Sequence, residues 1–109
     1  MMKIEAIIRP EKLNAVKTAL EAIGVVGMTV YDVHGRGEQR GIEFTHRAGK
    51  FRVDMLEKTK IEIVVNDKMT RNVCETICNA ARTGEVGDGK IFISPVAKSI
   101  RVRTGEEEV

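Results

Sequence analysis

The residues best suited to binding chemistry lie in one glycine-rich stretch, which reads TGEVGDGKIF from Thr83 to Phe92. Gly84 fits the left-handed backbone conformation that often follows the end of a helix. Gly87 and Gly89 lack the side chains that would keep a ligand away from the backbone N–H groups. Successive N–H groups of this kind form concave sites for anions. The stretch from 83 to 90, called the 83–90 loop below, is therefore predicted to bind a phosphate or a nucleotide.

Basic residues follow the 83–90 loop. Lys90 ends it, and Arg101 and Arg103 stand two residues apart, on one side of a short predicted strand. They could supply the positive charge that a phosphate chain requires. The alternative is that Gly-Asp-Gly is ordinary turn chemistry and that Lys90 is solvated. The Walker pattern G-x-x-x-x-G-K-[ST] is absent. The dinucleotide fingerprint fails too, because the loop follows a predicted helix and enters a predicted strand.

The composition predicts one soluble domain over residues 1–109, since 42% of the residues are hydrophobic and 31% are charged. No apolar stretch approaches the ~20 residues of a membrane span, and the first residues do not resemble a signal peptide. Two cysteines in such a chain suggest reduced thiols and a cytoplasmic location. The formal net charge of +2 is too small to argue for a nucleic-acid partner or an anionic membrane.

Hydrophobic periodicity predicts two successive β-α-β halves. The strands are predicted at Met2–Arg9, Met28–Val33, Thr59–Val65 and Lys90–Val96. The first helix is predicted from Glu11 to Ile23, and the second from a cap at Asn66–Asp67 to Gly84. Two such halves form a ferredoxin-like α+β fold, in which a four-stranded antiparallel sheet carries both helices on one face.

Two further segments lie outside these halves. Residues 34–58 are polar, interrupted by glycines and without core periodicity, and a loop of this length in a small domain is usually functional. The alternative is a hairpin extension with no special role. At the other end of the chain, Ile100–Thr104 is predicted to be a short strand, and Gly105–Val109 a solvated acidic tail.

The residue types that catalyse reactions form no recognisable constellation. Cys74 and Cys78 lie one turn apart on the second predicted helix, and the two histidines, His34 and His46, have no paired spacing. A metal site would need more ligands, so buried thiols are the favoured interpretation. No nucleophile stands with an identifiable base, and the chain is not expected to be an enzyme.

Four segments of the chain carry a family resemblance. They are Gly27–Val30, Lys60–Val65, Thr83–Phe92 and Ile100–Glu107. Together they resemble the PII nitrogen-regulatory signal proteins, to which the last two segments are specific, and the similarity covers nearly the whole chain. The resemblance implies a ferredoxin-like homotrimer with ATP or ADP in each cleft between subunits. It also implies 2-oxoglutarate bound beside Mg-ATP, and a long effector loop, here 34–58, that docks on target proteins.

By position, the resemblance implies a set of nucleotide-binding residues. They are Thr29, Gly35, Gly37, Glu38, Gln39, Glu62, Val64, Gly87, Asp88, Gly89, Lys90, Arg101 and Arg103. Residues 87–90 would contact the phosphates, which Arg101 and Arg103 would reach from a neighbouring subunit. Thr29, Glu62 and Val64 would line the adenine pocket. Gly35 and Gly37 would shape the base of the long loop.

The 2-oxoglutarate site implied by the resemblance uses Gln39, Gly41, Lys58 and Gly87. Gln39 would act through the Mg²⁺ ion, and Lys58 would bind the distal carboxylate. This division is physically reasonable, because a dicarboxylate needs a cation at its far end. A metal bridged to ATP would also make binding of the acid depend on which nucleotide is present.

The chain departs from the family pattern at three positions. Glu38 stands where many members have an arginine near the γ-phosphate, which reverses a charge and bears on the preference for ATP. Its backbone is still expected at the nucleotide. Phe51 replaces the tyrosine that enteric relatives uridylylate, and Gly49 replaces the serine that cyanobacterial relatives phosphorylate. No modification site is therefore expected.

Arg47 matches the arginine that plugs an ammonium channel in the transporter-regulating members, although it could also be a solvated loop charge. The expected partner is an ammonium transporter or, as in the nitrogenase-regulating branch, an enzyme of nitrogen metabolism. Contact with a membrane would occur only through a partner. An RNA-binding module is a remote alternative, because 4% aromatic residues leave little for base stacking. A small phosphatase would need a positioned base.

Overall fold

The computed structural model describes residues 1–36, 42–46, 49–53 and 55–109, with side chains described for 1–36 and 55–109. Its main sheet is antiparallel, with the strand order β2-β5-β1-β6. These strands are β1 (Met2–Ile8), β2 (Thr29–Gly35), β5 (Leu56–Val65) and β6 (Gly89–Pro95). The strands of the two halves interleave, since β1 of the first half lies between β5 and β6 of the second, as the ferredoxin-like prediction requires. The predicted α+β fold is confirmed.

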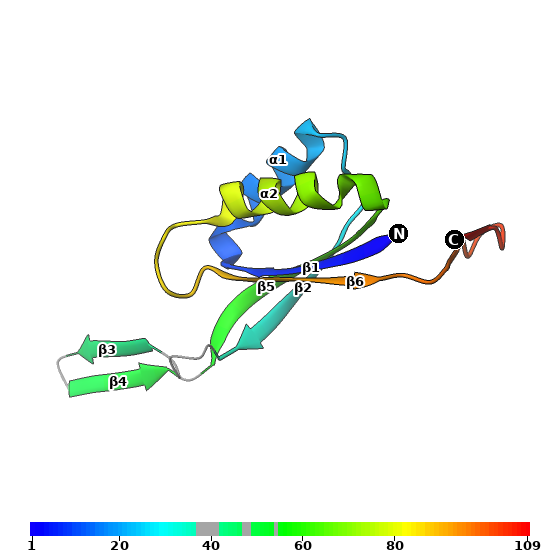
Figure 1. The fold of residues 1–109 in the computed structure, drawn as a ribbon. Helices are drawn as coiled ribbons and strands as arrows, with labels where there is room; N and C mark the ends of the chain where they lie inside the picture. The colour runs from blue at the N-terminus through cyan, green and yellow to red at the C-terminus, as the bar shows by residue number, and fades with distance from the viewer. Residues whose placement is uncertain (37–41, 47–48, 54) are drawn as a thin grey trace.

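Both α-helices pack on one face of this sheet (Figure 1). Helix α1 (Leu13–Ala22) follows the short 3-10 helix η1 (Pro10–Lys12), and α2 (Thr70–Ala81) follows η2 (Asp67–Met69). The predicted cap at Asn66 is confirmed, because its Oδ1 accepts a hydrogen bond from the Met69 N–H at 3.1 Å. Prediction extended the second helix too far. It ends at Ala81, and Gly84, at φ +91°, lies inside the following loop.

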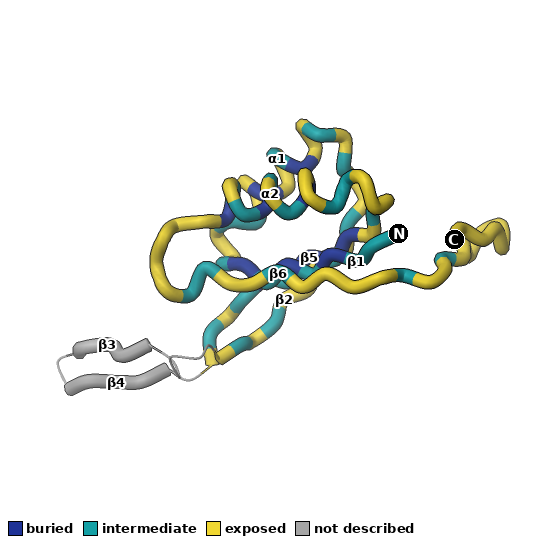
Figure 2. The backbone as a smooth tube through the Cα atoms, viewed as in Figure 1, coloured by how far each residue is buried: buried dark blue, intermediate teal, exposed yellow. Residues whose placement is uncertain are grey.

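The core fills the space between the helices and the sheet (Figure 2). Its buried residues are Ile4, Ala6, Ile8, Val16, Leu20, Ile61, Ile63, Val73, Ile77 and Ala81. Alternate residues of β1 and β5 point into this space because side chains alternate across a strand. The residues between them lie on the opposite side of the sheet, called the open face below, which no helix of the described residues covers. Tyr31, Val64 and Phe92 are each about half-exposed there.

Strand β5 begins three residues earlier than predicted, at Leu56 instead of Thr59. The extra residues pair with the end of β2, and Lys58 stands opposite Val33. Lys58 is thus held in a strand and is not part of a loop. Residues 34–58 also contain a second small sheet, formed by β3 (Ile42–His46) and β4 (Gly49–Val53). The sequence predicts a long loop here, with a hairpin extension as the alternative, and these two strands pair antiparallel as in a hairpin.

The end of the chain forms a small hairpin instead of the predicted strand and tail. Strand β7 (Ser99–Ile100) pairs with β8 (Glu107–Glu108), and residues 102–104 form the turn between them. Arg101 and Arg103 therefore do not share a strand face. In Figure 1 this hairpin lies beyond the end of β6, away from the helices and the 83–90 loop.

Candidate functional site

The 83–90 loop is held in shape by the side chain of Asp88. The Asp88 carboxylate accepts hydrogen bonds from the backbone N–H groups of Thr83 and Gly84, each at 2.9 Å, and from the Thr83 hydroxyl at 2.5 Å. The Thr83 hydroxyl oxygen also accepts from the Glu85 N–H at 3.1 Å. The Thr83 hydroxyl first, then the two N–H groups and Arg9, hold the pKa of Asp88 well below its ordinary value. The loop is thus closed around an ionised carboxylate.

Arg9, the residue that follows β1, binds the 83–90 loop from the side. Its Nε donates to Asp88 Oδ1 at 3.0 Å, and its Nη2 donates to the carbonyl oxygen of Val86 at 2.8 Å. Sequence reasoning missed Arg9 altogether. The only local signal is its place between a strand and Pro10, which says nothing about a partner 79 residues away.

Lys58 contacts the loop between the two points that Arg9 holds. Its ammonium group donates a hydrogen bond to the carbonyl oxygen of Gly87. Burial lowers the pKa of Lys58 below its ordinary value, and the nearby Arg9 guanidinium lowers it further. The Gly35 backbone lies beside the stem of this lysine, since a Cβ built there would be 3.8 Å from Lys58 Cγ. The structure therefore brings together Gly35, Lys58 and Gly87, three residues to which the family resemblance assigns roles in ligand binding.

Glycine is favoured at positions 87 and 89 of the loop for two different structural reasons. Both have positive φ, +100° at Gly87 and +107° at Gly89. A Cβ on Gly89 would lie 1.7 Å from the carbonyl oxygen of Ile7, so β6 can start beside β1 only with glycine there. A Cβ on Gly87 would lie 3.4 Å from Arg9 Nη2 and 3.6 Å from Lys58 Nζ. The close approach of two cations thus favours glycine at 87, independently of the ligand access predicted there from the sequence.

Thr29, Glu62 and Val64, which were predicted to line an adenine pocket, lie together on the open face. Thr29 of β2 stands opposite Glu62 of β5, and Val64 is two residues further along the same strand. Glu62 also accepts a hydrogen bond from the Tyr31 hydroxyl at 3.4 Å and pairs with Lys60 at 3.3 Å. This side of the sheet offers an apolar residue and a carboxylate next to each other.

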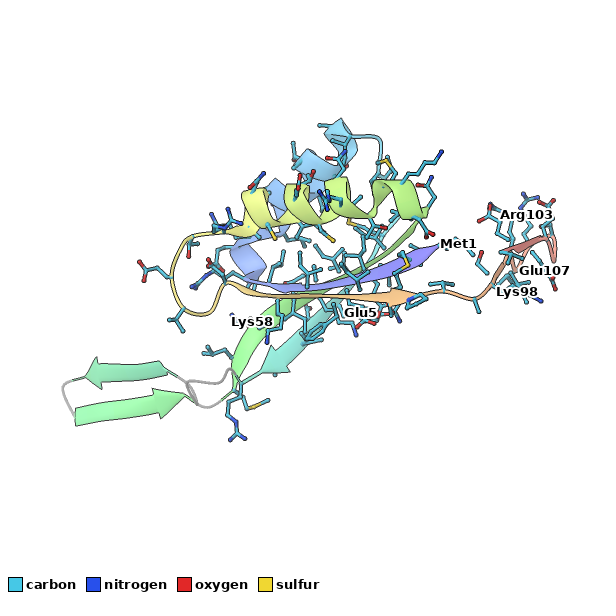
Figure 3. The ribbon with its side chains drawn as sticks, in the orientation of Figure 1. Met1, Glu5, Lys58, Lys98, Arg103 and Glu107 are labelled. Carbon is cyan, nitrogen blue, oxygen red and sulfur yellow. The ribbon has the colours of Figure 1, made fainter. Side chains whose placement is uncertain are left out.

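Arg101 and Arg103 are exposed on the C-terminal hairpin. Figure 3 labels Arg103 near Lys98 and Glu107, far along the molecule from Lys58. The hairpin is stabilised by the Arg101 N–H bonded to the carbonyl of Glu106 at 2.8 Å and by an ion pair of Lys98 with Glu107 at 3.3 Å. Within one copy of the chain, the two arginines do not meet the 83–90 loop.

Gly37, Glu38, Gln39, Gly41 and Arg47 lie outside the described residues. The expected metal contact through Gln39 therefore stays a prediction. Among the residues with described side chains, no group of three or more histidine, cysteine or acidic residues is arranged to hold a metal ion. None of the described helices is both long and apolar enough to cross a membrane.

The two cysteines are free and only partly buried, so the prediction of buried thiols holds in part. Cys74 packs against the core, and burial raises the pKa of its thiol. Cys78 lines an open pocket of about 240 Å³ between the end of α2 and the start of β6. Ile77 and Ile91 give this pocket an apolar character. It lies on the helix side of the 83–90 loop, whereas Lys58 and Glu62 belong to the open face.

The fold places the chain among the ferredoxin-like α+β proteins, with a glycine-rich loop between its second helix and its last main-sheet strand. The family model described as Nitrogen regulatory protein P-II matches residues 1–106. The chain belongs to the P-II family of nitrogen regulatory proteins, which are signal-transduction regulators and not an enzyme family.

Curated relatives agree with this assignment. The chain is 59% identical over 106 residues to Nitrogen regulatory protein P-II 2 of Methanothermobacter thermautotrophicus, covering 97% of this chain and 92% of that protein. It is 55% identical over 107 residues to Nitrogen regulatory protein P-II of Nostoc punctiforme, covering 98% and 96%. With the protein of that name from Klebsiella oxytoca it shares 50% over 108 residues, covering 99% and 96%.

Proposed function

We propose that this P-II protein reports nitrogen status by binding ATP or ADP at the 83–90 loop and 2-oxoglutarate beside Mg-ATP. The observation that carries the proposal is the arrangement of Arg9, Lys58 and the 83–90 loop. The carbonyl oxygens of Val86 and Gly87 already accept hydrogen bonds from these cations. Lys90 follows at the start of β6. A site with oriented backbone donors and nearby basic side chains suits a di- or triphosphate.

The proposed assembly is a homotrimer, with each nucleotide site shared between neighbouring copies. Two features support it. Arg101 and Arg103 are exposed on a hairpin that lies away from its own 83–90 loop, so they can serve a loop only in another copy. The open face also leaves Tyr31, Val64 and Phe92 half-exposed. Burial of such apolar area against other copies would stabilise a domain of this size.

The charged residues on the open face are compatible with the proposed association, because they already form ion pairs within one chain. Lys60 pairs with Glu5 at 3.5 Å and with Glu62 at 3.3 Å, and Lys3 pairs with Glu5 at 3.0 Å. The Lys60 ammonium also lies 5.2 Å from the centre of the Tyr31 ring. A face on which charges are already paired loses less free energy on leaving water than one with isolated charges.

The proposed effector response uses Lys58. The distal carboxylate of 2-oxoglutarate would replace the Gly87 carbonyl as the acceptor for the Lys58 ammonium. Mg²⁺ held by ATP and Gln39 would bind the other end of the acid. Because the metal is held by the triphosphate, binding of the effector would depend on the nucleotide. Glu38, in place of a cation, would reduce the preference for ATP over ADP.

The proposed output is regulation of a target protein in the cytoplasm through the segment 34–58, with an ammonium transporter as the leading candidate. Arg47 would contact that transporter. A target in nitrogenase regulation is the second candidate within the family. The positions of the aromatic residues do not favour an RNA-binding module, since Tyr31 and Phe92 lie on the edge strands β2 and β6 and not on the central strands.

Calorimetric titration with ATP, ADP and 2-oxoglutarate, singly and in combination with Mg²⁺, tests this proposal. We expect binding of both nucleotides, and binding of 2-oxoglutarate only with Mg-ATP present. Native mass spectrometry should show three copies. A protein that binds no adenine nucleotide, or that binds it fully as a monomer, would contradict the proposal. Phosphate release from ATP, measured in the same samples, checks the expectation that the chain is not an enzyme.

A further inference from the structure

We infer that Arg9 is a positioning residue for the nucleotide phosphates, and that it acts through Asp88 and the Val86 carbonyl without touching the nucleotide. The inference rests on the proposed function, in which the 83–90 loop binds phosphate. It adds a residue on β1's side of the site that sequence reasoning did not single out. Its basis is the set of hydrogen bonds that Val86, Gly87 and Asp88 accept from Arg9 and Lys58.

Arg9 and Lys58 together turn the loop carbonyls in one direction. The Val86 oxygen accepts from Arg9 Nη2 at 2.8 Å, and the Gly87 oxygen accepts from Lys58 Nζ. A trans peptide is planar, with its C=O and N–H pointing in opposite directions, and no peptide bond of the described residues is cis. The N–H group of Gly87 therefore points away from the Arg9 nitrogen that binds the Val86 carbonyl, and the N–H group of Asp88 points away from the Lys58 ammonium. The two N–H groups form a pair of neighbouring donors, as an anion site requires.

Arg9 also neutralises the Asp88 carboxylate, which belongs to the same loop as these donors. An unpaired carboxylate in that position would repel an incoming phosphate. Its charge is compensated by Arg9 Nε at 3.0 Å, and its remaining acceptor positions are used by Thr83 and Gly84. The side chain of Asp88 is consequently a structural part of the loop. If Asp88 contributes to phosphate binding, it does so through its N–H group.

An arginine suits this role better than a lysine. Arg9 uses two separate N–H groups, Nε and Nη2, for two acceptors that belong to residues 86 and 88. The fork of a guanidinium is rigid, whereas an ammonium is a point charge on a flexible stem. A lysine at position 9 would keep the charge but would not hold both acceptors in fixed positions. If Arg9 acted only as a distant charge, lysine would replace it fully.

The test is the affinity for ADP, measured by calorimetry on the wild type and on the variants Arg9→Gln, Arg9→Lys, Asp88→Asn and Arg9→Gln/Asp88→Asn. We expect Arg9→Gln to weaken ADP binding about ten- to hundredfold, on the scale of one charge-assisted hydrogen bond. Arg9→Lys should remain at least about fivefold weaker than the wild type. The control Lys17→Gln, which removes one positive charge from the exposed side of α1, should bind like the wild type.

The double variant separates positioning from direct contact. In the Asp88→Asn background, Arg9→Gln should lower the affinity for ADP less than about threefold. The reason is that the contact between Arg9 and the Asp88 carboxylate is already lost in that background. A full ten- to hundredfold loss of ADP affinity in that background would mean that Arg9 touches the nucleotide. Wild-type ADP affinity of Arg9→Lys would mean that only the charge of Arg9 matters. Either result overturns the inference. If Arg9→Gln does not fold, as judged by thermal unfolding, Arg9→Lys decides the question.

These outcomes are separate from failure of the proposed function. If the wild type itself does not bind ADP, the proposed function fails and this inference falls with it. If the wild type binds ADP and Arg9→Gln binds equally well, only the role of Arg9 is wrong. Native mass spectrometry of each variant checks that its state of association matches that of the wild type.

Discussion

The ammonium group of Lys58 donates a hydrogen bond to the carbonyl oxygen of Gly87. The cation that is predicted to bind 2-oxoglutarate is thus attached to the loop that is predicted to bind phosphates. Binding of a carboxylate by Lys58 would release the Gly87 carbonyl. A change at the effector site would in this way reach the backbone of the nucleotide site without any intervening residue.

Lys58→Ala should weaken binding of 2-oxoglutarate in the presence of Mg-ATP by about ten- to hundredfold, because it removes a charge-assisted hydrogen bond to the distal carboxylate. The affinity for ATP alone should change much less, since Arg9 still holds the 83–90 loop at Val86 and Asp88 and the phosphates have other expected ligands. Calorimetric titration of both ligands measures the two effects. Lys68→Ala, which removes an exposed lysine on η2, is the control. Equal loss of ATP and 2-oxoglutarate binding would reject the division of labour.

Gly89→Ala should destabilise the protein by about 3 kcal/mol or more, from the positive φ and from overpacking together. The new Cβ would lie 1.7 Å from the Ile7 carbonyl oxygen, so β6 would have to move away from β1. Gly84→Ala is the matched control, because its φ is +91° but no atom lies within 4 Å of its Cβ position. It should cost only about 1–2 kcal/mol.

Urea unfolding of both glycine variants measures the difference. The protein concentration is kept fixed, because the proposed association would contribute to stability. An equal decrease in the free energy of unfolding for the two variants would show that the contact between residue 89 and Ile7 does not destabilise the protein. The prediction concerns the fold alone and holds whatever the 83–90 loop binds.

Asp88 should make the stability depend on pH in acid. Its pKa is lowered in the folded state, chiefly by the Thr83 hydroxyl and also by the N–H groups of Thr83 and Gly84 and by Arg9. A carboxyl of this kind stabilises the fold at pH values above its ordinary pKa of 3.8, and this contribution is lost as the pH falls below that value toward the folded pKa.

The expected observation is a difference in stability between the wild type and Asp88→Asn that is constant from pH 7 to pH 5. The difference should shrink as the pH falls below about 4. Denaturant unfolding at a series of pH values measures it. Asp32→Asn, at an exposed position on β2, is the control and should track the wild type. A difference that grows in acid would have the wrong sign for this mechanism.

Periodicity was sufficient to predict the frame of the fold. Residues that alternate in β1 and recur three and four apart in α1 are the ones that fill the core, so burial itself produces the pattern. The early part of β5 gave no such signal. There Lys58 is held in the strand by pairing with Val33, and backbone pairing does not require an apolar side chain.

The C-terminal hairpin and Arg9 were missed for different reasons. The alternation of Ile100–Thr104 suggested a strand, but Gly105, at φ +74°, allows a turn in which its N–H bonds the Arg101 carbonyl at 2.7 Å. Arg9 makes its contacts across 79 residues of sequence, and such a contact leaves no local pattern. The glycines of the 83–90 loop were found because positive φ and close approach restrict the residue type at each position.

The last prediction concerns the sharing of the nucleotide site between copies. A site built from the 83–90 loop of one subunit and the arginines of the next can be damaged from either side. We expect Lys90→Ala to weaken ATP binding through the loop, and Arg101→Ala/Arg103→Ala to weaken it through the C-terminal hairpin, each by about tenfold or more. In a trimer that contains both variants, the loop substitution and the hairpin substitutions are on different subunits.

Co-expression of the two variants, each with a different affinity tag, gives such mixed trimers. Every mixed trimer then contains one site whose loop and arginines are both intact, because an undamaged loop faces an undamaged hairpin once around the ring. Calorimetry should recover wild-type ATP affinity at about one site per mixed trimer, and at none in either parent, which serves as the control. Since the C-terminal hairpin, which carries Arg101 and Arg103, lies away from the 83–90 loop of its own chain (Figure 1), recovery is expected only between copies. No recovery in mixed trimers would mean that each site is completed within one chain.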